Sequence, residues 1–398
     1  MRREDRESLR TSLPAALPAW LLLATALACG NGTQSDSLHD GAGDARFVEA
    51  VPLSDRIATD PASAEGGALE AAGDPGPETS ACTPGIEYTP HAILDLKLQS
   101  GEAANVADPC VLKLKDSWYL YATGTIPGVP LWVSQDLVDW EPKAPVWNPT
   151  SGTWNALGQM WAPHVQAAPD GYYLYYTANK QVGVAFAASP EGPFEEVYDH
   201  PLVGGGYGGI GNGVFEQRDK GFPALDFDEF SIDAFVLAAS DGSLTLYATS
   251  YNPMSMIVAI PMSDYATVVP ENARVVVEPA PSGWEFLVTE GPWVVEVADS
   301  IVLMYSGNSA DSNDYALGIA VADNPLGPFE KAASNPFLKA VPDKGFFGPG
   351  HHSVAPGACN DRLMFYHTKV TQAQGWERRI RYTPIAFSGT EVVLPPLP

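Results

Sequence analysis

The chain has 398 residues and a formal net charge of −26, with 48 acidic against 22 basic residues. Such a surface repels phosphate groups, which excludes nucleic acids and anionic lipid head groups as the natural substrate. Hydrophobic residues make up 45% of the chain, enough for a packed core, and four cysteines are too few for a disulfide scaffold. The 10 Trp, 16 Tyr and 15 Phe residues are typical of a β protein or a carbohydrate binder.

Residues 1–28 have the pattern of an export signal, with four arginines ahead of the apolar stretch LPAALPAWLLLATALA. The stretch is too short for a comfortable membrane span and contains two prolines, so we expect a signal peptide rather than a transmembrane helix. It ends in Leu-Ala-Cys-Gly, similar to a bacterial lipobox, in which cleavage precedes a lipidated cysteine. We therefore predict lipidation of Cys29 and an exported, membrane-anchored lipoprotein at the cell envelope or surface. Ordinary cleavage near Ala28 is the alternative.

The segment after this signal has the composition of a disordered chain. Residues 30–82 contain ten acidic and two basic residues, one Phe, and no Trp or Tyr. Such a segment buries too little apolar area to offset the loss of chain entropy on folding. We predict that residues 29–85 form a flexible acidic tether and that 86–398 form the catalytic domain.

One short unit recurs five times after residue 100. Each copy is a Tyr-rich, alternating strand that follows a turn signal, as in DSWYLYATG and DGYYLYYTA. The copies begin at Asp116, Asp170, Asp241, Asp299 and Asn360. The frame G-x-A-x-A-x-x-P-x-G-P-F-E also occurs twice, at 183–195 and 318–330. A period of about 60 residues, all strand and turn, predicts an all-β, five-bladed β-propeller.

Three acidic residues precede the hairpins at nearly the same distance. Asp108 and Asp233 lie 8 residues ahead of their hairpin Asp, and Glu290 lies 9 residues ahead. Because the innermost strands of all blades line one axial channel, equivalent positions should converge there. Three carboxyls in one cavity must differ in protonation state, and glycosidases use such a pair as acid and base. Each residue alone fits an ordinary turn, but the shared register favours a catalytic site.

Five motifs resemble the signature of glycoside hydrolase family 43, in the family's order and across residues 100–390. They are Asp108 in ADPCVLK, WAPHV from Trp161, Asp233 in SIDAFV, Glu290 in EGPW, and GPGHHSV from Gly348. The resemblance implies a five-bladed propeller that hydrolyses arabinosides or xylosides with inversion. Inversion places the two carboxyls about 6.5–9.5 Å apart.

The resemblance also implies a role for each acid. Asp108 is the general base that activates water, Glu290 is the general acid, and Asp233 tunes the pKa of the acid and orients it. Ala234 departs from the proline that the family usually has after the second Asp, which should loosen the backbone there.

His351 matches a family histidine that points into the axial channel, often next to a bound calcium. Because calcium prefers oxygen ligands, we expect His351 to be a structural channel residue or to reach such an ion through water. No cofactor is required for the chemistry. His352 should pack on the other side of the strand, and the His-His pair lacks the spaced partners of a zinc site.

Aromatic and basic residues are candidates for contact with the sugar. Trp161 and Trp293 are candidate stacking platforms, with core packing as the alternative for each. Arg379 and Arg381 lie in the closing strand ERRIRYTPIAF, where family members carry an arginine near the sugar. Either fits, and Arg379 is our candidate for substrate binding.

The run GGGYGGIGNG contains G-x-G-x-x-G from Gly206, but neither a helix nor a βαβ unit follows, so we expect a mobile loop beside the active-site face. If Cys29 is lipidated, an odd number of cysteines remains, which leaves a free thiol. In propellers the first segment commonly completes the last blade, so we predict a Cys82–Cys359 disulfide that closes the ring. We expect Cys110 to be buried and inert.

The expected function is that of an exo-acting, inverting α-L-arabinofuranosidase on arabinose- or xylose-containing plant polysaccharides. The absence of a large domain after the fifth blade leans toward arabinose. A β-xylosidase and an endo-α-1,5-arabinanase of the same family are alternatives. An alternative of another class is a catalytically silent glycan-binding propeller at the cell surface, which has no need of an acid/base pair. We expect a monomer whose partner is carbohydrate, with membrane contact only through the lipid anchor.

Overall fold

The computed structural model describes residues 86–124, 128–149, 153–155, 160–204, 231–251, 254–359 and 361–398. All of these belong to one compact unit, Gly67–Pro398. The predicted signal peptide with Cys29, the acidic tether with Cys82, and the glycine-rich run from Gly206 lie outside the described residues and stay predictions. None of the helices in the described part of the chain has the length and apolar character needed to span a membrane.

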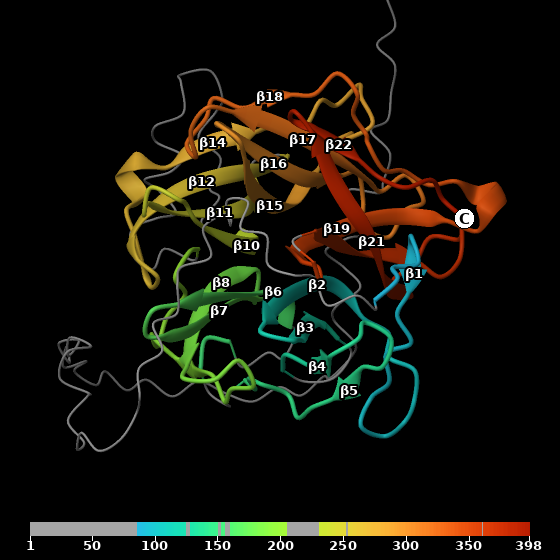
Figure 1. Cartoon of the computed structure of the whole chain (residues 1–398). Coiled ribbons are helices and arrows are strands. Elements are labelled where there is room, and N and C mark those ends of the chain that lie inside the picture. The colour runs from blue at the N-terminus through green and yellow to red at the C-terminus, as the bar shows by residue number, and fades with distance from the viewer. Residues whose placement is uncertain are drawn as a thin grey trace, which may run out of the picture. The chain divides into compact units, whose positions relative to one another are not determined.

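The described residues form five antiparallel sheets, which we number as blades 1 to 5 in chain order (Figure 1). Blade 1 contains β2 (Ala107–Leu114), β3 (Ser117–Thr123), β4 (Leu131–Ser134) and β5 (Glu141–Pro142). Blade 2 contains β6 (Met160–Ala168), β7 (Gly171–Ala178), β8 (Gln181–Ala187) and β9 (Glu195–Glu196). Blade 3 contains β10 (Ser231–Ala238), β11 (Leu244–Tyr251), β12 (Ser255–Asp264), β13 (Thr267–Val268) and β14 (Arg274–Val277).

The last two blades carry the closure of the ring. Blade 4 contains β15 (Thr289–Val297), β16 (Ser300–Gly307), β17 (Ala316–Ala322) and β18 (Glu330–Lys331). Blade 5 contains β19 (Phe347–Pro356), β20 (Arg362–Lys369), β21 (Arg378–Ser388), β22 (Glu391–Val393) and the N-terminal β1 (Ala92–Ile93). Within the described ranges the helical segments are two short 3₁₀ turns, η4 (Pro270–Asn272) and η5 (Pro342–Lys344).

The innermost strand of each blade contacts the innermost strands of both neighbours. β2 contacts β6, β6 contacts β10, β10 contacts β15, β15 contacts β19, and β19 contacts β2. Figure 1 shows these strands gathered around the middle of the domain. The predicted all-β, five-bladed β-propeller is therefore confirmed.

Each pair of neighbouring blades packs through its own hydrophobic cluster. The clusters include Tyr121 with Leu174, Tyr175 with Leu246, Tyr247 with Leu303, Met304 with Tyr366, and Phe365 with Leu120. Adjacent residues of one second strand, such as Leu120 and Tyr121, belong to different interfaces because strand side chains alternate. Both faces of the second strands are thus buried, so the alternation predicted for the hairpins separates two apolar interfaces rather than core from solvent.

The N-terminal segment completes the last blade, as expected. Ala92 pairs with Tyr382 and Ile93 pairs with Arg381, which joins β1 to β21. Cys359, on the same blade, is disulfide-bonded, and Cys110 is a free, buried thiol whose pKa burial raises to about 12. These states agree with the predicted roles of both cysteines, while the proposed partner Cys82 lies outside the described residues.

Candidate active site

All five innermost strands carry a β-bulge at the same place. The ladder between the first and second strand shifts register there in every blade. One residue of each bulge has a left-handed backbone: Asp108 (φ 51°), Ala162 (φ 44°), Asp233 (φ 58°), Gly291 (φ 57°) and His351 (φ 39°). A bulge breaks the simple alternation of side chains and re-aims one of them. In this domain the bulge of every blade redirects a residue at the same level of the channel.

The bulges explain the spacing of the three acids. Asp108 and Asp233 both occupy the left-handed position, whereas Glu290 lies one residue earlier and Gly291 takes that position in blade 4. The longer spacing of Glu290 therefore comes from its place one position before the left-handed residue, and blade 4 has no inserted residue there. The prediction that the three acids hold equivalent positions is correct for two of them and one residue off for the third.

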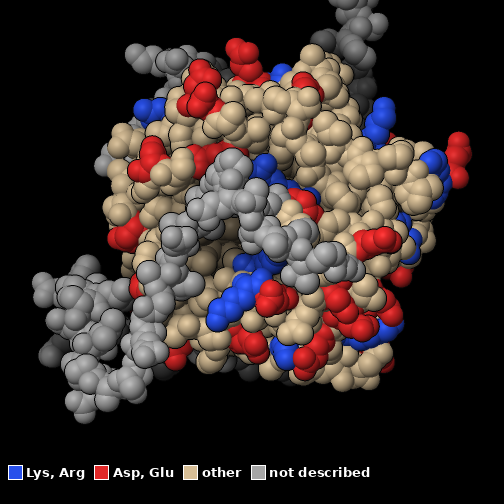
Figure 2. All heavy atoms as spheres, in the orientation of Figure 1, with Lys and Arg blue, Asp and Glu red and all other residues tan. Residues whose placement is uncertain are grey.

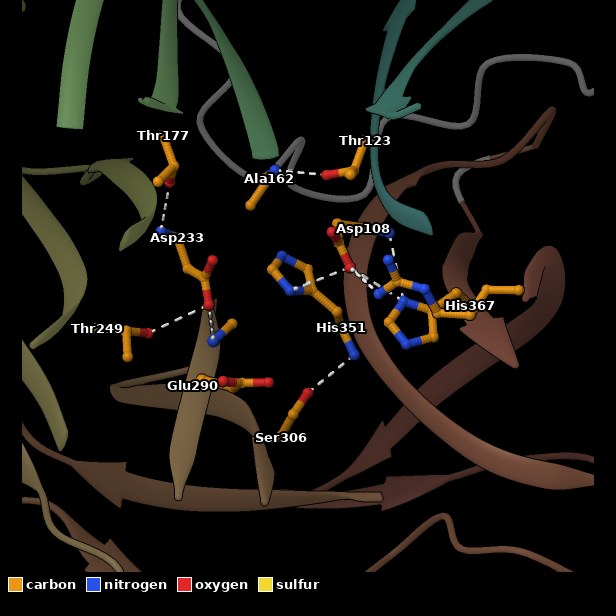
Figure 3. Close-up of polar contacts among 12 residues, drawn as sticks. Asp108, Thr123, Ala162, Thr177, Asp233, Thr249, Glu290, Ser306, His351 and His367 are labelled. Atoms are coloured by element: carbon orange, nitrogen blue, oxygen red, sulfur yellow. Dashed lines mark hydrogen bonds and ion pairs between the residues drawn. The ribbon is translucent and has the colours of Figure 1, made fainter. Parts of the chain in front are cut away.

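Side chains of the second strands bind the left-handed residues across the blade boundaries (Figure 3). In four blades the backbone N–H of the left-handed residue donates a hydrogen bond to a side chain of the preceding blade. The donor and acceptor pairs are Ala162 and Thr123 Oγ1 (2.7 Å), Asp233 and Thr177 Oγ1 (3.1 Å), His351 and Ser306 Oγ (2.8 Å), and Asp108 and His367 Nδ1 (3.3 Å). At the remaining boundary, Gly291 N–H and the Thr249 hydroxyl both donate to Asp233 Oδ2, at 3.1 and 3.4 Å. Each buried N–H thus has a partner, and the channel is pre-organised around its whole ring.

Asp108 faces three basic side chains from blade 5. Its Oδ1 lies 3.1 Å from His367 Nδ1, 3.5 Å from His351 Nδ1, and 3.5 Å from Arg378 Nη1. With a proton on Nδ1, His367 donates to the carboxylate, and without it the same nitrogen accepts the Asp108 N–H. Burial raises the pKa of Asp108, but His351, Arg378 and His367 together hold it well below its usual range. Asp108 is therefore ionised at neutral pH.

The other two acids lie in the opposite electrostatic situation. Within the described part of the chain, neither Asp233 nor Glu290 forms an ion pair. Burial, then the charges of Glu290 and Asp108, raise the pKa of Asp233 well above its usual value. Burial, with the charge of Asp108 adding to it, raises the pKa of Glu290 to about 7. Asp233 and Glu290 thus keep their protons to higher pH than ordinary carboxyls do, while Asp108 favours the anion.

Tyr315, which the sequence did not single out, contacts Glu290. Its hydroxyl donates to Glu290 Oε1 over 2.7 Å, and its ring stacks on His367 with centroids 5.6 Å apart. The ring lies directly on Gly350, where an added Cβ would be 1.9 Å from Tyr315 Cε1. Gly350, the second glycine of GPGHHSV, is therefore the one sequence signal of this contact, because any side chain there would displace the tyrosine.

The sugar-contact candidates fall into different environments. Trp161 lies on β6 at the register position that Glu290 has on β15, and it is partly exposed. The Trp293 ring packs on Phe235 and His164, with centroids 4.6 and 5.4 Å apart. Trp293 thus has the environment of the packing alternative, and for Trp161 both alternatives stay predictions.

Arg378, rather than Arg379, faces the base. Adjacent residues of a strand point to opposite sides, and β21 begins with Arg378 directed at Asp108. Arg379 reaches the carbonyl of Val370 at 3.5 Å, and Arg381 binds Thr368 and the carbonyl of His91. The predicted arginine of the closing strand is present, but the residue that contacts the site is one position earlier.

The histidines of the channel belong to no set of metal ligands that the described part of the chain provides. His351 contacts Asp108, and the buried His352 has its pKa lowered to about 3, first by burial and then by the charge of His351. No group of three or more His, Cys, Asp or Glu side chains suited to a metal occurs among the residues the structure describes. Calcium takes six to eight oxygen ligands, which imidazole-rich surroundings do not supply. An ion reached through water stays a prediction.

Sequence comparison identifies relatives among known glycosidases. The chain is 24% identical over 263 residues to the beta-D-galactofuranosidase xynD of Aspergillus niger, covering 62% of this chain and 67% of that protein. It is 25% identical over 327 residues to the extracellular exo-alpha-(1->5)-L-arabinofuranosidase of Streptomyces avermitilis, covering 77% and 62%. The alpha-L-arabinofuranosidase 43 of Humicola insolens is 25% identical over 284 residues, covering 65% and 54%. The chain thus spans half to two thirds of the length of these relatives.

Solved structures agree on the fold. A thermostable family-43 glycoside hydrolase matches with a TM-score of 0.64 at 27% identity, over 77% of this chain and 98% of that one. An alpha-L-arabinofuranosidase from Lactobacillus brevis matches with a TM-score of 0.57 at 20% identity, over 72% and 92%. The sequence model of the glycosyl hydrolases family 43 matches residues 103–391. The chain therefore belongs to glycosyl hydrolase family 43.

Proposed function

We propose that this chain hydrolyses the glycosidic bonds of arabinose- or xylose-containing plant glycans with inversion, and that it is an exo-acting α-L-arabinofuranosidase. The observation that carries the proposal is the contrast between two carboxyls of one channel: Asp108 faces three basic side chains, whereas Glu290 has Tyr315 as its polar side-chain partner among the described residues. A glycosidase needs this pairing, since one group must donate a proton while the other accepts one. In Figure 2 the face is hollowed near its middle, where basic side chains lie beside acidic ones.

The proposed reaction is a single displacement. Asp108 accepts a proton from a water molecule as the water oxygen attacks the anomeric carbon. Glu290 gives its proton to the glycosidic oxygen, the bond between that oxygen and the anomeric carbon breaks, and the leaving sugar departs as an alcohol. After one turnover Asp108 is protonated and Glu290 ionised, and proton exchange with solvent restores the starting state. Water attacks from the side opposite the leaving group, so the configuration inverts.

Asp233 supports the acid through the backbone. Its Oδ2 accepts the N–H of Gly291, the residue that follows Glu290, and so holds the bulge from which the acid projects. It is a positioning residue in this proposal. Arg378, which is always charged, favours the ionised form of Asp108, and burial lowers the pKa of His351 beside it. Arg378 and His351 are the two side chains placed to bind hydroxyls of a sugar held against Asp108.

The preference for arabinose draws on the relatives. Two of them are named arabinofuranosidases and one a galactofuranosidase, so five-membered sugar rings are common to the three names. A β-xylosidase and an endo-arabinanase are the alternatives within the family. Aryl α-L-arabinofuranoside, aryl β-D-xyloside and aryl β-D-galactofuranoside, offered separately to the purified chain, discriminate among the sugars. Fastest hydrolysis of the arabinoside supports the proposal, and hydrolysis of none of the three contradicts it.

The stereochemistry has its own test. Proton NMR during the first turnovers reports which anomer of the free sugar forms before mutarotation. Inversion of an α-L-arabinofuranoside gives the β anomer first. The α anomer as first product would mean retention, and would remove Asp108 from the role of a base acting through water.

We also propose that the chain is exported and anchored through a lipid on Cys29. The supports are the lipobox-like sequence around Cys29 and the word extracellular in the name of the Streptomyces relative. Metabolic labelling with a radioactive fatty acid in a bacterial host should label the chain, and Cys29→Ala should abolish the label. A labelled Cys29→Ala chain would contradict the anchor.

A further inference from the structure

Two large aromatic side chains are exposed among the described residues, and both lie in loops at the acid-bearing end of the channel. Phe286 is 50% exposed and precedes Glu290 by four residues. Trp376 is 60% exposed and lies between β20 and β21. Because Lys369, the last residue of β20, pairs with Phe347, the first residue of β19, this loop opens at the same end as the bulges. An exposed tryptophan at a channel mouth is a candidate binding surface.

The loop that carries Trp376 is held in place from blade 4. The buried Lys369 ammonium donates to the carbonyls of Asp311 and Ala373, at 2.5 and 2.6 Å. Gly375 N–H donates to the same Asp311 carbonyl over 3.0 Å, and Gln374 Nε2 donates to the Asp311 carboxylate over 2.7 Å. A buried cation that binds two carbonyls fixes the course of the backbone, since its donors would otherwise be left without partners.

The far end of the loop is fixed from blade 1. Arg378 N–H donates to Asn105 Oδ1 over 2.9 Å. The Arg378 guanidinium lies over the Trp376 ring, 5.4 Å from its centroid, and its Nη1 is 3.5 Å from Asp108 Oδ1. The ring is therefore one side chain away from the proposed base, and its position is pre-organised by a cation–π contact.

We propose that Trp376 is a stacking platform for a second sugar residue, the neighbour of the one held between Asp108 and Glu290. The proposal rests on the proposed function and extends it, because it makes an oligosaccharide, rather than a single glycosyl unit, the ligand of the site. The C–H groups of a sugar face carry partial positive charge and pack against the electron-rich face of an indole. A pre-organised, solvent-exposed ring offers this surface without the cost of ordering a side chain.

The test uses the Glu290→Gln variant, which should bind substrate but hydrolyse it slowly. Isothermal titration calorimetry measures its binding of arabinotriose, xylotriose and galactotriose, and of the matching single sugars. Adding Trp376→Ala should weaken binding of the recognised trisaccharide about tenfold and change binding of the single sugar less than about twofold. Trp376→Phe, which keeps a ring, should recover most of the affinity. Val138→Ala is the matched control, because Val138 is 71% exposed in the outer part of blade 1.

Equal losses for trisaccharide and single sugar would overturn the platform, since the ring would then act only through Arg378. The Trp376→Ala substitution is also made alone, and the pH profile of its activity is measured. Its acid limb should not shift, which would show that trisaccharide binding weakens while the Arg378–Asp108 contact stays intact. Binding of none of the three trisaccharides would also overturn the platform. The proposed function has a separate failure: the unsubstituted chain would not hydrolyse pentosides. In that case, galactotriose binding whose affinity depends on Trp376 would still support the platform.

Discussion

The two sides of the channel give a carboxyl group opposite electrostatic environments. On one side, Asp108 lies among His351, His367 and Arg378, and its pKa is held well below the usual range. On the other, Glu290 has only Tyr315 as a polar side-chain partner among the described residues, and burial raises its pKa to about 7. All the basic groups of the first side come from β19, β20 and β21, which are strands of one blade.

The difference does not come from the backbone. Asp108 and Asp233 have nearly the same left-handed conformation, at φ 51° and 58°, and both N–H groups bind the preceding blade. Their pKa values nevertheless move in opposite directions. The repeat therefore supplies equivalent places for carboxyls, and the side chains particular to blade 5 decide which of them is ionised.

The largest effect should follow removal of the anionic side of the pair. Asp108→Asn keeps the shape of the side chain but leaves no group to accept a proton from water, so kcat/KM should fall by about 10³-fold or more. Asp116→Asn is a matched control, because Asp116 is exposed at the hairpin of the same blade. Steady-state kinetics on the preferred aryl glycoside measure both. A loss below about tenfold for Asp108→Asn would mean that another group is the base.

The protonated side should show itself in the pH profile. Activity requires Glu290 to hold a proton, so kcat/KM should decline as the pH rises through about 7, and the acid limb should lie well below the usual carboxyl range because Asp108 stays ionised there. Glu290→Gln should remove the alkaline limb and lower kcat/KM by about 10²-fold or more on substrates with poor leaving groups.

The loss in Glu290→Gln should shrink as the leaving group improves, since a stable aryloxide needs no proton. Glu296→Gln is the control on the same strand, where the carboxylate binds Ser240 instead. An alkaline limb that persists in Glu290→Gln would assign the protonated group to another residue.

The convergence of the three acids could be predicted from the sequence because it follows from repetition. Hairpin copies fix the blades, and a propeller brings the starts of its innermost strands together. Asp108, Asp233 and Glu290 can therefore be found without any knowledge of their neighbours. The place of Glu290 one position before the left-handed residue is already present in its longer spacing, but the spacing alone does not tell an insertion from a change of position.

The partners of the acids follow no repeat, and the sequence did not show them. Tyr315 comes from the turn before β17, and His367 stands where the other second strands have Thr or Ser, as at Thr123 and Ser306. Which arginine of β21 faces Asp108 depends on the pairing register of that strand, and the sequence leaves this register open. Arg379 and Arg381 share a face, and only the pairing of β21 in blade 5 places Arg378 on the other face, toward Asp108.

Removing the Tyr315 hydroxyl, the one polar side-chain partner of Glu290 among the described residues, should sharpen the contrast between the two sides. The Tyr315 hydrogen bond stabilises the carboxylate form and lowers the pKa of Glu290, so Tyr315→Phe should move the alkaline limb to higher pH and leave the acid limb in place. Tyr247→Phe is the control, because its hydroxyl binds the carbonyl of Pro325 away from the acids. A downward shift of the alkaline limb, or equal shifts in both variants, would contradict the assignment.

The smallest effect on activity should come from the inter-blade hydrogen bonds that both sides share. Thr123→Val removes the acceptor of the Ala162 N–H while keeping the volume of the side chain, so the unfolding free energy should fall by about 1–3 kcal/mol. Thr383→Val is an isosteric control, since the buried Thr383 hydroxyl has no hydrogen-bond partner in the described part of the chain, and the change should be close to neutral. Because the Thr123 hydrogen bond joins blades 1 and 2 and involves none of the three basic groups around Asp108, both pH limbs should stay where they are. A shift of either limb in Thr123→Val would mean that the ring of hydrogen bonds sets the ionisation of the acids as well as holding the blades, and that the contrast between the two sides is partly a property of the backbone after all.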